Sequence, residues 1–132
     1  MVPGTGVIAN ETAAAMQKNG RNLFAVGNRT HGKAVAFAEN YNIGKVYDSY
    51  DEMCTDPDVD IIYITTPHNT HITYLRAALA AGKHVLCEKA ITLNSAELDE
   101  ARAIADEHNV VLMDATTVLH MPLYQELRRR MD

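Results

Sequence analysis

Long apolar runs are absent from this sequence of 132 residues. No stretch approaches the roughly 20 consecutive apolar residues that a membrane-spanning helix needs. No positively charged segment followed by an apolar core opens the chain, so a secretory signal is not indicated. We therefore expect a cytoplasmic protein with no membrane partner.

Cysteine is scarce, with two residues, Cys54 and Cys87, and no C-x-x-C spacing. Cys87 lies inside an apolar run. A metal-binding or redox pair is not favoured by this arrangement. We expect both side chains to be reduced packing residues.

Basic residues are fewer than acidic ones: the chain has 12 Lys and Arg against 17 Asp and Glu, which gives a net charge of -5. The only dense basic cluster is Arg128 to Arg130, at the end of an expected last helix. This balance argues against nucleic acid as the main partner. Cations favour a helix C-terminus, which we prefer to a binding patch as the explanation of the cluster.

Apolar residues nonetheless make up 47% of the chain and charged residues 22%, as in soluble globular domains. Short, continuous apolar runs alternate with longer segments of helical periodicity. Such runs are typical of parallel strands that are covered on both faces. The pattern predicts one α/β domain with a doubly wound parallel Rossmann sheet. Strands are expected near residues 23–26, 61–64, 85–87 and 110–113, and helices near 8–19, 31–41, 69–81 and 94–108.

A glycine-rich turn, G-x-G-x-x-A, precedes the first expected helix. Gly4 permits a tight turn, Gly6 lets the backbone approach a pyrophosphate, and Ala9 allows close packing of helix on sheet. The free N–H groups of the helix start would face the phosphates. A purely structural glycine turn is the alternative. The cofactor-binding residues expected here are Gly4, Thr5, Gly6, Val7 and Ile8.

The end of the next strand lacks a carboxylate. NAD-binding proteins place an Asp or Glu about 20 residues past the turn to hold the ribose 2'-hydroxyl, but this sequence has Asn28, Arg29 and Thr30. A guanidinium suits a 2'-phosphate. NADP is therefore favoured over NAD as the cofactor. Two alternatives stay open: Arg29 could stack on the adenine or project into solvent.

The stretch YITTPHNTHITYLRAALAAGKHVLCEKAITLNSAEL resembles the Gfo/Idh/MocA oxidoreductase family. Within it, VLCEKAITLN is most similar to the dihydrodiol and xylose dehydrogenase branch. The glycine turn, the Asn28–Arg29 strand end, the loop from Thr66 to His71 and the Glu88–Lys89 pair appear in family order and spacing.

The resemblance implies an NAD(P)-dependent dehydrogenase of sugars, polyols or cyclic diols. It implies that Lys89 reaches the substrate's reacting oxygen and is the catalytic residue. A lysine beyond a strand end can act as acid, base or oxyanion stabiliser during hydride transfer. The resemblance further implies cofactor contacts from a second set of residues: Thr66, Pro67, His71, Glu88 and Lys89.

Ala90 departs from the family pattern, and a histidine pair raises the question of a metal site. Ala90 stands where the family usually has proline, which frees the backbone after Lys89. His68 and His71 form an H-x-x-H pair, but no further ligand lies at a familiar metal spacing, so no metal is expected.

The ends of the chain also carry expectations. The strand before the glycine turn is central in a Rossmann sheet, and Met1, Val2 and Pro3 are too few to build it. We therefore expect a fold that lacks most of the first strand. Residues 1–118 are assigned to the dinucleotide-binding domain, and 119–132 to the connection toward an absent C-terminal α/β domain.

Two functions follow as expectations. One is the nucleotide-binding domain of a dehydrogenase, weakly active or inactive alone, because the resemblance implies that a second domain supplies most of the substrate pocket. The other is a non-catalytic dinucleotide-binding module or an inactive fragment. A small carbohydrate-like substrate is the expected partner, and a homo-oligomer remains open.

Overall fold

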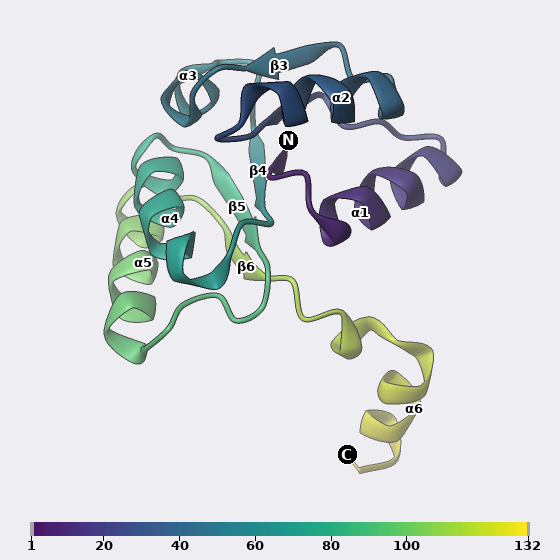
Figure 1. Cartoon of the computed structure of the whole chain (residues 1–132). Helices are drawn as coiled ribbons and strands as arrows, with labels where there is room; N and C mark the ends of the chain where they lie inside the picture. The colour runs from purple at the N-terminus through teal and green to yellow at the C-terminus, as the bar shows by residue number, and fades with distance from the viewer. Residues whose placement is uncertain (1, 132) are drawn as a thin grey trace.

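The structure is a computed structural model and describes residues 2–131. Parallel strands alternate with helices along the chain (Figure 1). Two short 3-10 helices cover His68–Thr70 and Thr117–His120. The strands are β1 (Val2–Pro3), β2 (Ala25–Gly27), β3 (Lys45–Tyr47), β4 (Ile61–Ile64), β5 (His84–Cys87) and β6 (Leu112–Asp114). The helices are α1 (Val7–Lys18), α2 (His31–Tyr41), α3 (Tyr50–Thr55), α4 (His71–Ala80), α5 (Ser95–Glu107) and α6 (Pro122–Met131).

The strands pair in parallel in the orders β1-β2-β3 and β4-β5-β6. β1 lies beside β4 and joins the two halves. The spatial order is therefore 3-2-1-4-5-6, the order of a Rossmann sheet. The doubly wound fold predicted from the alternating pattern is confirmed.

The first strand is short, as expected for a fold that lacks most of it, but the two residues Val2 and Pro3 do pair with β2. Val2 lies opposite Val26, and Pro3 lies opposite Gly27. Gly4 continues the pairing, since its N–H donates to the carbonyl oxygen of Gly27 at 2.8 Å. A two-residue strand with this extra hydrogen bond thus occupies the central position. Met1 lies outside the described residues.

Both faces of the sheet are covered, which explains the continuous apolar runs. Along β2, Ala25 belongs to the core under α4 and α5, whereas Val26 belongs to the core under α1 and α2. In β4, Ile62 and Ile64 face the first core and Tyr63 packs against the second. Successive side chains of a strand point to opposite faces, so each strand must supply apolar residues to both layers.

The buried cysteines belong to the first of these cores. Cys54 lies in α3 and Cys87 ends β5, and both are free thiols. Burial raises the pKa of Cys54 to about 11 and that of Cys87 to about 12. Both stay protonated and unreactive near neutral pH, as expected for packing residues.

Strand β3 and helix α3 were not predicted individually. The short helix begins after Ser49, whose hydroxyl accepts a hydrogen bond from the Glu52 N–H at 3.2 Å. At the start of α5, the Asn94 side chain accepts a hydrogen bond from the Glu97 N–H at 3.0 Å. Local capping chemistry therefore sets both helix starts.

The C-terminal helix α6 leaves the body of the domain (Figure 1) and has no buried residue. Arg128 to Arg130 lie in its last turn, the position expected to suit cations. Glu126 pairs with Arg129 and with Arg130, each at 2.8 Å. Across residues 2–131, none of the helices has the length and apolar character to cross a membrane.

A polar cluster surrounds Asp56, the residue that follows α3. The Asp56 carboxylate accepts hydrogen bonds from the Lys45 ammonium and the Tyr47 hydroxyl, and also from the Asp58 N–H at 2.8 Å. The Asp56 carbonyl oxygen accepts from the Lys83 ammonium at 2.7 Å. These donors, Lys45 first, hold the pKa of the Asp56 carboxyl well below its ordinary value of 3.8.

Asp56 should therefore contribute to acid sensitivity. A carboxylate whose pKa is lower in the folded state stabilises the fold above its unfolded pKa of about 4, and that stabilisation is lost as the pH falls toward the folded value. Asp56→Asn should lower the melting temperature at pH 7 by several degrees and flatten its decline between pH 5 and 2. Calorimetry across that range tests this, with exposed Asp99→Asn as the control. An unchanged acid limb in the Asp56 variant would contradict the assignment.

Candidate functional site

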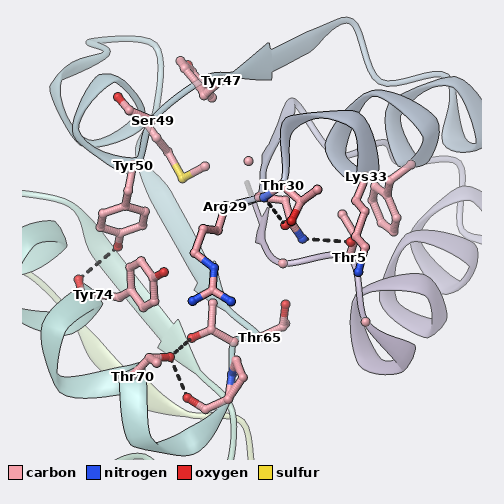
Figure 2. A pocket seen from close by; sticks show the side chains of 18 of the residues that line it. Thr5, Arg29, Thr30, Lys33, Tyr47, Ser49, Tyr50, Thr65, Thr70 and Tyr74 are labelled. Atoms are coloured by element: carbon pink, nitrogen blue, oxygen red, sulfur yellow. Dashed lines mark hydrogen bonds between the residues drawn. The ribbon is translucent and has the colours of Figure 1, made fainter.

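A cleft of about 1270 Å³ lies at the carboxyl ends of the strands, where open α/β sheets bind ligands (Figure 2). Its walls come from the β1–α1 turn, the β2 end, the start of α3 and the β4–α4 loop. These segments are far apart in sequence and meet because the central strands end side by side. The expected cofactor residues that line it are Gly4, Thr5, Gly6, Asn28, Arg29, Thr66 and Pro67.

The two turn glycines have different physical roles. Gly4 has a φ of +118°, and a Cβ there would lie 2.8 Å from Thr65 Oγ1. The conformation and the close approach to the β4 end both require glycine. Gly6 has a φ of -76°, which any residue adopts, and a Cβ there would meet nothing within 4 Å. Because Gly6 lines the cleft, its missing side chain leaves space for a ligand.

Helix α1 begins at the cleft wall without a side-chain cap on its first N–H groups. Its first turn contains no acidic residue, so nothing there opposes an anion. Ala9 is fully buried, which seats the helix start against the sheet. The side chains of Val7 and Ile8 are 73% and 38% exposed and do not line the cleft. The contact expected from these two residues therefore falls to their backbone N–H groups, because their side chains do not face the cleft.

Asparagine side chains hold the turn in shape. Asn28 Nδ2 donates to Thr5 Oγ1 at 2.9 Å, and Asn28 Oδ1 accepts from the Thr30 N–H at 2.8 Å (Figure 2). Asn10 Nδ2 donates to the Gly6 carbonyl oxygen at 2.8 Å. Asn28 thus ties the turn to the β2 end, and Asn10, which the sequence analysis missed, supports it from α1.

Two cations face the cleft, one after β2 and one in the first turn of α2. Arg29 points across it toward Thr65 and Thr70, and Lys33 stands on the opposite side, at the start of α2 (Figure 2). Neither forms an ion pair with any residue within 2–131. The carboxylate of Asp48 also lines the cleft but pairs with His31 at 2.7 Å. The sequence did not lead us to expect Lys33 at the site, although it follows Arg29 by four residues.

The far wall is formed by the β4 end and the start of α4. Thr70 Oγ1 donates to the Pro67 carbonyl oxygen at 2.6 Å and lies 3.0 Å from Thr66 Oγ1. Beside them, the rings of Tyr50 and Tyr74 meet edge to face at 4.6 Å, and the Tyr50 hydroxyl donates to the Tyr74 carbonyl oxygen at 3.0 Å. The wall combines small hydroxyl groups with an aromatic surface.

Glu88 and Lys89 follow β5, next to β4, and do not line the cleft itself. Glu88 is 8% exposed and accepts a hydrogen bond from the Tyr63 hydroxyl. Burial, and then this contact with Glu88, raise the pKa of Tyr63. The Lys89 side chain is exposed. The peptide bond that joins Lys89 to Ala90 is cis.

His71 lies beneath this loop and is fully buried. Its Nδ1 is 3.0 Å from the Ala90 carbonyl oxygen, and its Nε2 is 2.9 Å from the Thr66 carbonyl oxygen. It does not line the cleft. The His68 ring meets it edge to face at 5.5 Å. Both ring nitrogens of His71 thus face backbone acceptors, and no group of three metal-ligating side chains occurs in the described part of the chain.

The chemistry of the cleft suits a dinucleotide. The pyrophosphate fits the open space over Gly6 and the uncapped N–H groups at the start of α1. A ribose phosphate fits Arg29 and Lys33, which have no ion-pair partner among residues 2–131. The aromatic wall can accept a planar base. The residues present therefore fit the nucleotide cofactor that the sequence motifs imply.

Comparisons with known proteins agree with this geometry. Residues 1–116 match a family described as an oxidoreductase family with an NAD-binding Rossmann fold. The chain is 38% identical over 122 residues to trans-1,2-dihydrobenzene-1,2-diol dehydrogenase of Xenopus tropicalis, covering 92% of this chain and 36% of that protein. The human protein of that name is 35% identical over 130 residues, covering 96% of this chain and 39% of that one.

Solved structures share the fold. An NAD-binding oxidoreductase from Klebsiella pneumoniae superposes with a TM-score of 0.91 at 27% identity, covering 98% of this chain and 37% of that one. KijD10, a 3-ketoreductase from Actinomadura kijaniata in complex with NADP and TDP-benzene, gives a TM-score of 0.90 at 28% identity, covering 99% and 41%. The chain thus spans about two fifths of the length of these relatives. On the match of residues 1–116, the chain belongs to the Gfo/Idh/MocA oxidoreductase family.

Proposed function

We propose that this chain is the cofactor-binding part of an NADP-dependent dehydrogenase that acts on a sugar, a polyol or a cyclic diol. The observation that carries the proposal is the cleft at the strand ends, with open space over Gly6 beside the uncapped start of α1. Family membership adds the reaction class. Because the chain is similar to dehydrogenases named for a 1,2-diol, we favour a vicinal diol as its substrate.

Preference for NADP rests on charge. Arg29 follows β2, where NAD-binding sheets place a carboxylate, and Lys33 faces the cleft from the first turn of α2. A 2'-phosphate gains charge-assisted hydrogen bonds from such a pair, whereas a 2'-hydroxyl does not. The KijD10 complex holds NADP, which is consistent with this preference.

Lys89 is proposed as the catalytic residue. A bound nicotinamide accepts or donates the hydride. The substrate oxygen must then lose or gain a proton, and Lys89 carries an exposed ammonium beside the β4 end to do so. Thr66 and Pro67 would border the nicotinamide end of the cofactor, because they line the cleft next to this loop.

Deuterium transfer tests the catalytic part of the proposal. The chain is incubated with NADP and trans-1,2-dihydrobenzene-1,2-diol deuterated at its carbinol carbons, and the cofactor is analysed by mass spectrometry. We expect slow transfer that Lys89→Met lowers at least tenfold when both chains are compared at saturating NADP. Lys18→Met, in the last turn of α1, is the control. Cofactor binding with no transfer would mean that the chain is inactive alone, which is the result expected of a non-catalytic dinucleotide-binding module or an inactive fragment.

A further inference from the structure

The backbone around Lys89 is held on both sides while its side chain is exposed. On the preceding side, Glu88 is buried, bonds the Tyr63 hydroxyl and accepts from the Lys89 N–H at 3.3 Å. On the following side, the Ala90 carbonyl oxygen lies 3.0 Å from His71 Nδ1. The second contact was not foreseen, because the family resemblance places His71 at the cofactor.

Through its other ring nitrogen, His71 contacts a residue that lines the cleft. Nε2 lies 2.9 Å from the carbonyl oxygen of Thr66, which lines the cleft. One fully buried ring therefore joins the β4–α4 loop, which borders the cleft, to the β5 loop that carries Lys89. A carbonyl oxygen only accepts hydrogen bonds. A neutral imidazole ring has one N–H and donates a hydrogen bond to one of the two loops, whereas a protonated ring has two and donates to both.

We infer that His71 is a positioning residue that sets the place of Lys89 relative to the bound cofactor. This inference rests on the proposed function, since it takes Lys89 as the proton-transfer group. Ala90 lacks the restraint on φ that proline would give at this position. The contact from the buried His71 ring to the Ala90 carbonyl supplies a restraint in its place, and the contact to Thr66 makes that restraint sensitive to the cleft.

A spectroscopic experiment follows Lys89 directly. The chain is produced with 13C-labelled lysine, and Lys89→Arg identifies the Lys89 side-chain signal by its disappearance. On saturation with NADPH, we expect the Lys89 signal of the wild-type chain to shift and that of Lys18 to stay in place. In His71→Asn, the shift of the Lys89 signal should fall by at least half, or the signal should broaden into several positions.

A rescue variant separates positioning from general stability. Adding Ala90→Pro to His71→Asn should restore the cofactor-induced shift of Lys89, because proline limits the same stretch of backbone. A loss of packing at a buried residue would not be restored in this way. If the His71 variants do not fold, the wild-type chain still tests the contact. The buried His71 ring N–H should give a slowly exchanging NMR signal with a nuclear Overhauser contact to Ala90 or Thr66.

The outcomes are distinguishable from failure of the proposed function. If the wild-type chain does not bind NADPH, the proposed function fails. If it binds NADPH and the Lys89 shift is the same in His71→Asn, the positioning role is wrong. A rapidly exchanging His71 ring proton without either contact would also overturn it.

Discussion

Gly6→Val should abolish cofactor binding while leaving the fold intact. The backbone at Gly6 has a φ that valine accepts, and a Cβ there meets no protein atom within 4 Å. The added side chain would instead occupy the cleft space beside the α1 N–H groups, where the pyrophosphate is expected. The valine side chain would clash with the pyrophosphate and remove its charge-assisted hydrogen bonds to the α1 N–H groups. A loss of about 3 kcal/mol weakens NADPH binding at least 100-fold, since each ~1.4 kcal/mol is a factor of ten. Fluorescence titration with NADPH measures the affinity.

Gly44→Val is the matched control for this variant. Gly44 also has open space around its Cβ position and no positive φ, but it does not line the cleft. Both variants should melt within about 3 °C of the wild type, the small change typical of surface substitutions. NADPH binding by Gly6→Val at wild-type strength would place the pyrophosphate elsewhere.

The double variant Arg29→Ala/Lys33→Ala should lose its preference for NADPH. Each cation can form a charge-assisted hydrogen bond with the 2'-phosphate, worth about 1.5–3 kcal/mol. The two bonds together are worth at least about 3 kcal/mol, so the double variant should bind NADPH at least 100-fold more weakly. NADH lacks this phosphate, so its affinity should change less than about threefold. Calorimetric titration with both cofactors gives the ratio.

Arg21→Ala provides a control, because Arg21 is exposed and lies outside the cleft. The single variant Arg29→Ala distinguishes the two roles considered for this residue. Equal losses for NADPH and NADH would mean that Arg29 stacks on the adenine rather than reading the phosphate. No loss for either cofactor would mean that it projects into solvent.

The fold was predictable where sequence pattern and local chemistry agree. The continuous apolar runs at β4 and β5 reflect strands that serve two cores, and the helix cap at Asn94 depends only on neighbouring residues. Strand β3 and helix α3 escaped prediction because they are short and carry weak periodicity. The pairing of the two-residue β1 was not predicted for a different reason. It depends on tertiary contact with β2 rather than on the sequence of β1 itself.

The candidate site shows the same division. The glycine turn and the β2 end follow from chain order, since a turn after a strand falls at the edge of the sheet. The contacts of His71 with Thr66 and Ala90 join three segments, so sequence spacing could not reveal them. The support of the turn by Asn10 depends on the rotation of α1 and was equally hidden.

The central claim is that the cleft binds NADPH in preference to NADH. Its most direct test is the melting temperature of the purified chain as each cofactor is added, because a ligand that binds only the folded form stabilises it by about 2.7 kcal/mol at 100 times its Kd. We predict a rise of ~10 °C with saturating NADPH and a smaller rise with NADH at the same concentration. An equal rise with both would contradict the role of Arg29 and Lys33, and no rise with either would contradict the assignment of the cleft.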